Sequence, residues 1–148
     1  MEELNEALLS AWIRLSASVI NSRVVEELSY SESQVCHALY RSYQKDPDHC
    51  MTATSLCAET KMLKSQMNRT LNLLESKGII TRQRSEQDKR QVYVRVNWEG
   101  ADVYRAQHDR ILKLVDGIIG RMGISRARDA VDLLNQIANI ADDCLSGK

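Results

Sequence analysis

The apolar residues of this chain change their spacing once, and that change limits the possible folds more than any other feature. Over most of the 148 residues they recur every three or four positions, as on one face of a helix, and Pro47 is the single proline. Between residues 79 and 96 they alternate instead, with Val92, Val94 and Val96 at every second position. A period of two is that of a strand. The sequence therefore predicts a mostly helical fold with one small β-hairpin.

Residues suited to helix ends divide the helical part into segments. Polar residues suited to N-caps precede four of these: Ser31 with Gln34, Thr52, Asn97 and Ser125. Pro47 ends the second helix near Asp46, and Gly78 ends the fourth, which begins at about residue 63. Together with a first helix that carries an apolar stripe from Leu4 to Leu15, these signals predict six helices.

Charge is distributed unevenly, although the net charge of the chain is zero. Residues 61–95 hold nine Lys and Arg against three acids, a net charge of +6, whereas residues 1–60 carry −5 and residues 96–148 carry −1. A local positive field attracts phosphate whatever the charge of the whole molecule. The middle of the chain is therefore the candidate region for nucleic-acid contact.

Length and composition restrict the class of protein. A chain of 148 residues with 43% hydrophobic residues is expected to form one domain with an ordinary core. No apolar stretch is long enough to span a membrane, and the first residues are acidic, so we expect a cytoplasmic protein. The three histidines are scattered and no phosphate loop or nucleophile motif occurs, so neither catalysis nor a cofactor is expected.

The last helix has an especially wide apolar face. Alternating steps of four and three separate Ala130, Leu134, Ile137, Ala141 and Cys144, which is the spacing of a coiled-coil seam. Such a face needs a partner, either within the monomer or in a second subunit. We expect a homodimer formed by the chain ends. Its interface is predicted to include Leu4, Leu8, Ile118, Leu134, Ile137 and Ala141.

Between residues 52 and 100, the expected order of helix, turn, helix and charged hairpin is that of a winged helix-turn-helix. The residues there resemble the MarR family of bacterial transcription regulators. The likeness is carried by Leu56, the runs Lys64–Arg69 and Leu74–Arg82, the sequence Asp88, Lys89, Arg90, and the strand Val92–Val96. Leu63 departs from the family, which usually has a capping Ser or Thr at that place.

The resemblance implies a winged helix-turn-helix with N- and C-terminal dimerisation helices. It divides one compact chain into an N-terminal dimerisation helix at 1–30, a DNA-binding lobe at 31–98 and C-terminal dimerisation helices at 99–148. The implied function is that of a homodimeric regulator, more often a repressor than an activator. Its implied partners are a pseudo-palindromic operator in double-stranded DNA and a small-molecule effector that releases it.

In such a lobe the second helix of the pair enters the major groove. Because Met67, Leu71 and Leu74 should face the core, the other face is expected to meet DNA. The residues expected there are Lys64, Ser65, Gln66, Asn68 and Arg69.

The hairpin supplies a second set of predicted DNA contacts. Arg90 resembles the wing arginine of the family, which enters the minor groove. Arg82, Arg84 and Lys89 are expected to contact phosphate. Asp88 is expected to brace the wing, because a carboxylate that faces phosphate is repelled unless it orients neighbouring arginines.

The effector site implied by the resemblance lies where the dimer helices meet the DNA-binding lobe. The residues predicted to line it are Trp12, Ser16, His37, Tyr40, Tyr43 and Met67.

Alternatives to this function remain open at the level of sequence. A redox switch is possible at Cys50 or Cys36, and a zinc site at Cys36 with Glu32, His37 and His108, whereas Cys57 and Cys144 are best explained as buried small residues. A winged-helix interaction module that does not read DNA is a further alternative. The concentration of basic charge in residues 61–95 argues against that module.

Overall fold

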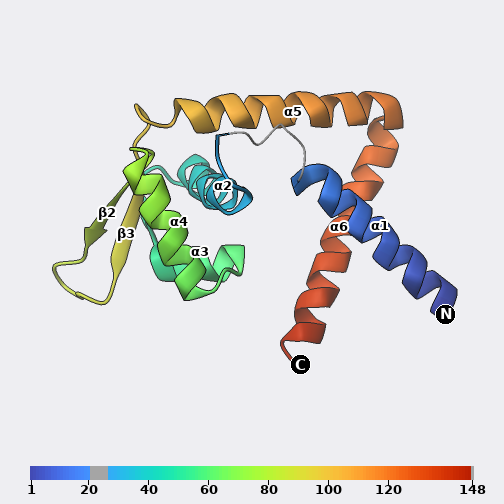
Figure 1. Cartoon of the computed structure of the whole chain (residues 1–148), viewed down its shortest axis with the longest axis horizontal. Coiled ribbons are helices and arrows are strands. Elements are labelled where there is room, and N and C mark those ends of the chain that lie inside the picture. The colour runs from blue at the N-terminus through green and yellow to red at the C-terminus, as the bar shows by residue number, and fades with distance from the viewer. Residues whose placement is uncertain (21–26, 148) are drawn as a thin grey trace. The chain divides into compact units, whose positions relative to one another are not determined.

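The computed structural model describes residues 1–20 and 27–147. Its elements, in chain order, are α1 (Glu2–Ile20), α2 (Tyr30–Lys45), β1 (Met51–Thr52), α3 (Ala53–Thr60), α4 (Lys64–Ser76), β2 (Ile80–Arg84), β3 (Val92–Val96), α5 (Asp102–Met122) and α6 (Ile124–Leu145) (Figure 1). The predicted mostly helical fold with a hairpin wing is confirmed. The chain divides into two units, Met1–His108 and Asp109–Lys148.

The helix starts show where local signals suffice. Thr52 caps α3 as predicted, since its hydroxyl accepts the backbone N–H of Ser55 at 3.1 Å. The prediction of Ser31 as the cap of α2 is wrong, because that helix begins at Tyr30 with Ser29 as its cap. Ser29 and Glu32 form the capping box, and Glu32 also accepts a hydrogen bond from Lys77, the residue after α4, which stabilises the earlier start.

The two later caps were also predicted wrongly. The Asn97 side chain donates to the carbonyl of Gly78 at 3.1 Å, and α5 begins five residues later at Asp102. At the start of α6 the N-cap position is Gly123, which makes no side-chain cap and has a φ of +87°. Glycine adopts this left-handed region without steric cost, so a sharp turn between α5 and α6 replaces a polar cap at Ser125.

The sheet has the strand order β1-β3-β2 and is antiparallel throughout. Ile80 pairs with Val96 and Arg84 with Val92, so β2 and β3 form the predicted hairpin. Strand β1 was not predicted, because two residues are too few to display alternation. Its Met51 pairs with Val94 and covers the other edge of β3.

The core of the first unit lies among α2, α3, α4, the sheet and the first turns of α5. Leu56, Met67 and Leu74 are completely buried in it, as are Val35 and Leu71 within a percent. Ala101 and Tyr104 at the start of α5 are buried in the same cluster, and Gln107 is 3% exposed. The first turns of α5 therefore belong to the packing of the lobe.

The helix α1 presents a different surface. The large apolar residues between Leu4 and Leu15 are all exposed by at least half of their area, including Leu4 at 70%, Leu8 at 55% and Trp12 at 57%. They follow the predicted helical stripe but are not part of the core cluster.

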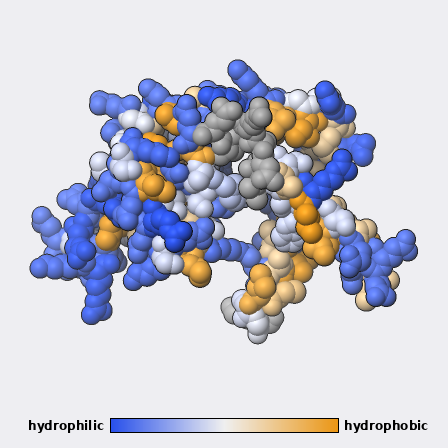
Figure 2. All heavy atoms as spheres, in the orientation of Figure 1, coloured by the Kyte–Doolittle hydropathy of each residue, from blue (hydrophilic) through white to orange (hydrophobic). Residues whose placement is uncertain are grey.

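The second unit, Asp109–Lys148, consists of the rest of α5 and α6. No residue of α6 is buried, although Ile137 and Ala141 are half-buried, and Ile118 and Leu134 are exposed. Figure 2 shows apolar side chains at the surface of α6, near the C-terminus. None of the helices in the described part of the chain combines the length and apolar character needed to cross a bilayer.

Candidate nucleic-acid interface

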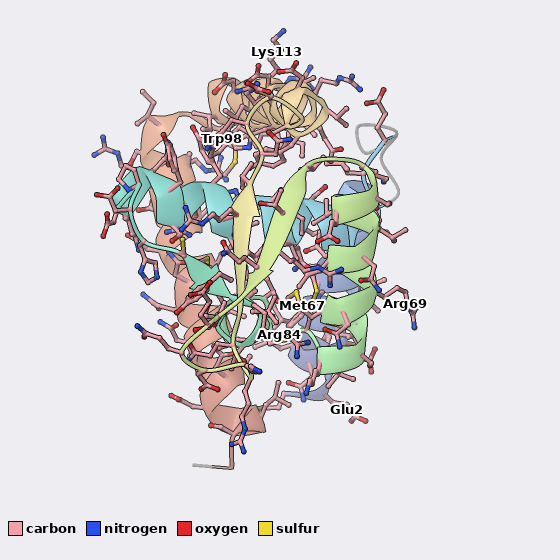
Figure 3. All side chains as sticks on the ribbon, turned by 90° about the vertical axis from the view of Figure 1, so that its left-hand side faces the viewer. Glu2, Met67, Arg69, Arg84, Trp98 and Lys113 are labelled. Atoms are coloured by element: carbon pink, nitrogen blue, oxygen red, sulfur yellow. The ribbon has the colours of Figure 1, made fainter. Side chains whose placement is uncertain are left out.

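The helix α4 has one buried and one exposed face, as its sequence predicts. Met67, Thr70, Leu71 and Leu74 are buried against the lobe. The residues predicted to meet DNA are all exposed: Lys64, Ser65, Gln66, Asn68 and Arg69. Figure 3 shows Met67 directed into the lobe and Arg69 directed away from it. The geometry thus leaves amide and guanidinium groups, which can pair with base edges, on the outer face.

The N-terminus of α4 is not closed by a side chain. Leu63 occupies the N-cap position and makes no side-chain cap hydrogen bond. It is also 74% exposed. The first backbone N–H groups of a helix carry partial positive charge and have no partner within the helix. At this end, beside Lys64 and Ser65, they are suited to a phosphate oxygen.

The wing has an ordered tip. The Ser85 N–H donates to the Gln91 carbonyl at 2.9 Å, and the Asp88 N–H donates to the Ser85 hydroxyl at 3.1 Å. The Asp88 carboxylate accepts the backbone N–H of Arg90 at 3.0 Å. Asp88 therefore shapes the turn that presents Arg90, which supports its predicted role as a brace.

The cations of the wing differ in what surrounds them. Arg84, Lys89 and Arg90 are exposed, as expected of groups that contact DNA. Arg82, predicted to contact phosphate, is half-buried and occupied. Its guanidinium donates to Glu75 at 2.9 Å and to Asn72 at 2.6 Å, both on α4. Arg82 thus fastens the first strand of the wing to α4.

The same contact affects the acid. The hydrogen bond from Arg82 holds the pKa of the Glu75 carboxyl below its usual value. Glu75 is one of three acids in the basic segment, and this pairing neutralises it locally. The same pair neutralises Arg82, so the net charge of +6 over residues 61–95 is carried by the other side chains.

Only some of the residues predicted to line an effector site are brought together. Tyr40 lies among aromatic rings, with centroids 5.6 Å from His108, 6.1 Å from Trp98 and 6.2 Å from Tyr104. His37 stacks on His108 at 6.1 Å. Burial, with smaller contributions from Arg41 and His108, lowers the pKa of His37, which favours the neutral ring.

The prediction of Met67 in this site is corrected by the structure. Met67 has no exposed surface and belongs to the closed core of the lobe, because the stripe of α4 that contains it packs inwards. Trp12 and Ser16 lie on α1, and their part in a ligand site stays a prediction.

A cavity that the sequence did not indicate lies beside β3 and includes Tyr43. It has a volume of about 240 Å³ and is lined by Leu39, Ser42, Tyr43, Pro47, His49, Cys50, Met51, Val94, Arg95, Val96 and Trp98. The rings of Tyr43 and Trp98 are 4.9 Å apart. Tyr43 therefore faces the sheet edge, whereas His37 and Tyr40 pack towards α5. The aromatic Trp98 after the last strand was the one available sequence signal.

The cysteines bear on the redox and zinc alternatives. Burial, together with the negative charge of Glu32, raises the pKa of the Cys36 thiol to about 12. A thiol that stays protonated is a poor nucleophile, so Cys36 is not suited to the redox role predicted for it. Cys50 is half-buried and keeps that role as a prediction.

Two of the residues proposed as zinc ligands are not suited to bind a metal ion. Glu32 is committed to Ser29 and Lys77, and the thiolate that zinc requires is disfavoured at Cys36. Over the described residues, no three His, Cys, Asp or Glu side chains gather in a way that could hold a metal ion. Of the two cysteines predicted to be buried, Cys57 is half-buried against the core and Cys144 is exposed, because the seam of α6 has no partner within its unit.

Comparison with known proteins identifies the fold and the family. The structure is similar to the PcaV transcriptional regulator from Streptomyces coelicolor, solved with its natural ligand, with a TM-score of 0.72, 19% identity and coverage of 90% of this chain and 91% of that one. It is similar to Streptococcus pneumoniae FabT in complex with DNA, with a TM-score of 0.66, 22% identity and coverage of 97% and 98%.

A third similar structure is that of the MarR family transcription regulator SP03579, with a TM-score of 0.75, 13% identity and coverage of 99% of this chain and 95% of that one. The MarR-like winged-helix fold is therefore confirmed. No curated protein sequence matches the chain. The profile of a family described as transcriptional regulator SarA/Rot matches residues 21–106. These relatives are transcription regulators and not enzymes, and the chain belongs to the SarA/Rot family of transcriptional regulators.

Proposed function

We propose that this regulator binds double-stranded DNA as a homodimer, with α4 in the major groove and the β2–β3 wing at the backbone and minor groove. The observation that carries the proposal is the outer face of α4. All five predicted contact residues, Lys64, Ser65, Gln66, Asn68 and Arg69, are exposed there, while the opposite face of the helix closes the core. The five outer residues therefore do not form part of the buried core.

The residue roles follow from the chemistry of each side chain. Asn68 and Gln66 pair with adenine edges, and Arg69 pairs with guanine. Lys64, Ser65, Arg84 and Lys89 bind phosphate, which fixes the register on the duplex without reading sequence. Arg90, presented by Asp88, enters the minor groove. Arg82 is assigned to the junction of the wing and α4 in place of phosphate contact.

Dimerisation is supported by the apolar residues left exposed on the chain ends. Leu4 and Leu8 on α1, Ile118 on α5 and Leu134 on α6 keep about half of their surface or more in contact with solvent. Contiguous apolar surface on a soluble protein marks an interface. A second copy, which offers the same surfaces about a twofold axis, would also explain a pseudo-palindromic operator, because two equivalent lobes read two half-sites.

Repression relieved by an effector is the proposed mode of regulation. PcaV, which shares the fold, was solved with its natural ligand, and FabT was solved with DNA. In this chain the rings of Tyr40 and Tyr104, His37 and His108 make an aromatic wall between α2 and α5. The two α4 helices of the dimer can lie at different separations. A small molecule that binds the dimer more tightly at one separation than at another would change operator affinity.

Selection of binding sites from random duplexes, followed by fluorescence anisotropy, tests the function. A pseudo-palindromic consensus with a steep salt dependence of affinity is expected. Lys45→Ala is the control and should keep the wild-type affinity, since Lys45 is an exposed cation outside residues 61–95. If no duplex is enriched and only non-specific affinity is measured, the alternative of a winged-helix interaction module replaces this proposal.

A further inference from the structure

The recognition helix α4 is held by another helix and not by its own cap. Leu63 provides no capping side chain. Two long side chains, Gln66 near the start of α4 and Lys77 directly after its end, instead reach the first turn of α2, at Ser31 and Glu32. These contacts link residues 35 and 45 positions apart in the sequence.

The first contact involves a residue assigned to base reading. The Gln66 amide donates to the Ser31 hydroxyl at 3.1 Å. Gln66 also belongs to the exposed face of α4. One amide hydrogen is used within the protein, while the side-chain carbonyl oxygen and the second amide hydrogen have no partner among the described residues. A side chain restrained in this way presents its remaining groups in a defined direction.

The second contact involves a buried carboxylate. Glu32 is 3% exposed, and its two oxygens accept different donors. One accepts the backbone N–H of Ser29, the cap of α2, at 3.2 Å, and the other accepts the Lys77 ammonium at 2.7 Å. Lys77 also donates to the carbonyl of Glu27 at 3.1 Å. The end of α4 is therefore fixed to the same turn that starts α2.

We infer that the first turn of α2 sets both the position of the recognition helix and the direction of the Gln66 side chain. Ser31 and Glu32 are then positioning residues that determine sequence preference without contact with DNA. Lys77, although it lies in the basic segment, serves this fixation and not phosphate binding. The inference rests on the proposed function, because it assigns to α4 the reading of bases.

Ser31→Ala tests the first contact. Loss of the hydroxyl frees Gln66, so the preference at the base pair read by Gln66 should fall by about tenfold, as expected for one lost coupling. Gln66→Ala should do the same, and the double variant should lose no more than either single variant. Ser42→Ala, on the same helix and eleven residues farther along, is the control and should keep the wild-type preference.

Lys77→Met and Glu32→Gln test the second contact. Both should weaken operator binding by about tenfold, and their double variant should be no weaker than one single variant. The slope of log affinity against log salt should stay at the wild-type value in Lys77→Met, because no phosphate contact is lost. Lys77→Arg, which restores a cation that can reach Glu32, should recover affinity, and far-ultraviolet circular dichroism should confirm that each variant is folded.

The outcomes separate this inference from the proposed function. If wild type binds no operator, the proposed function fails. If wild type binds and Ser31→Ala keeps the wild-type base preference, the assignment of Ser31 is overturned. A salt slope that falls by about one in Lys77→Met makes Lys77 a phosphate contact and overturns its assignment here.

Discussion

The helices α4 and α6 have the same spacing of apolar residues, but α4 is packed in a core and α6 is exposed to solvent. On α4, Met67 and Leu74 have no exposed surface, whereas on α6 Leu133 and Leu134 are 58% and 54% exposed. The lobe that contains α4 supplies neighbours from α2, α3 and the sheet, and the second unit supplies no comparable cover for α6. An apolar stripe thus predicts that a face will be buried, but not whether the same chain does the burying.

The difference also separates two kinds of function. The lobe forms its own buried core, and its outer surface is available for polar contacts with a partner. The chain-end helices keep apolar surface available, which suits association with a second copy. Substitutions that had the same effect on stability and association in both regions would contradict this difference.

The largest effect is expected from the lobe core. Leu74→Ala should destabilise the lobe by about 2–5 kcal/mol, because it removes a completely buried side chain and leaves a cavity. Leu73→Ala, at a neighbouring position that is 45% exposed, is the matched control and should cost much less. Urea denaturation measures both. Equal losses in the two variants would show that the burial of α4 does not stabilise the lobe.

The next effect concerns the chain-end helices. Leu134→Asp or Ile137→Asp should produce monomers in sedimentation, because an unpaired charge in an apolar interface is costly to desolvate. Operator affinity should fall by orders of magnitude, since two half-sites must be engaged together. Lobe stability should be unchanged. Variants that stay dimeric and bind normally would place the interface elsewhere.

A smaller effect is expected at the base-reading face. Asn68→Ala should cost about 1–3 kcal/mol with the preferred operator and relax the preference at one base pair. The lobe should unfold at the same urea concentration as wild type, because Asn68 is exposed. A competition assay with single-base operator variants measures this. Uniform weakening over all duplexes would instead identify Asn68 as a backbone contact.

At the wing tip the expected change is mainly in salt dependence. Arg90→Ala should weaken binding to all duplexes and lower the salt slope by about one, as for the loss of a single cation at the DNA. Asp88→Asn should not lower the slope, because no cation is lost and the amide oxygen can still accept the Arg90 N–H. Anisotropy titrations over a range of salt concentrations measure both. An unchanged slope in Arg90→Ala would remove the wing from the interface.

The smallest effects are expected at two thiols, Cys36 in the lobe and Cys144 on α6. Cys36 should resist alkylation at neutral and mildly alkaline pH, because burial raises its pKa to about 12. Cys144 is exposed and should react, more slowly in the dimer than in Leu134→Asp. As pH rises above the ordinary thiol value, the unfolded chain ionises Cys36 and the folded chain does not, so stability should fall. Mass spectrometry of labelled peptides, and denaturation at several pH values, check these results.

Much of the fold followed from local signals. The alternation at Val92, Val94 and Val96 predicted the wing, and Thr52 and Gly78 marked the ends of α3 and α4, because a cap or a left-handed residue acts on its own helix. The wrong start of α2 lies where two local signals compete. Ser29 with Glu32 and Ser31 with Gln34 have the same spacing, and a lysine 45 residues away favours the first.

The candidate site divides in the same way. Helical periodicity was enough to orient Asn68 and Arg69 outwards, since residues on one helix keep fixed directions relative to each other. It could not show that Arg82 is held by Glu75 and Asn72, nor that Gln66 meets Ser31. Spacing along the chain carries no information about side chains that meet across elements.

The helical class, the wing, the basic centre and the apolar stripe of each helix could be predicted from the sequence, because they depend on residues within a few positions of one another. The tertiary structure decided which stripes are buried, which cations are already paired and which thiol is protonated. Those properties depend on the neighbours that a folded chain brings near, and on the water and charge that they exclude or supply.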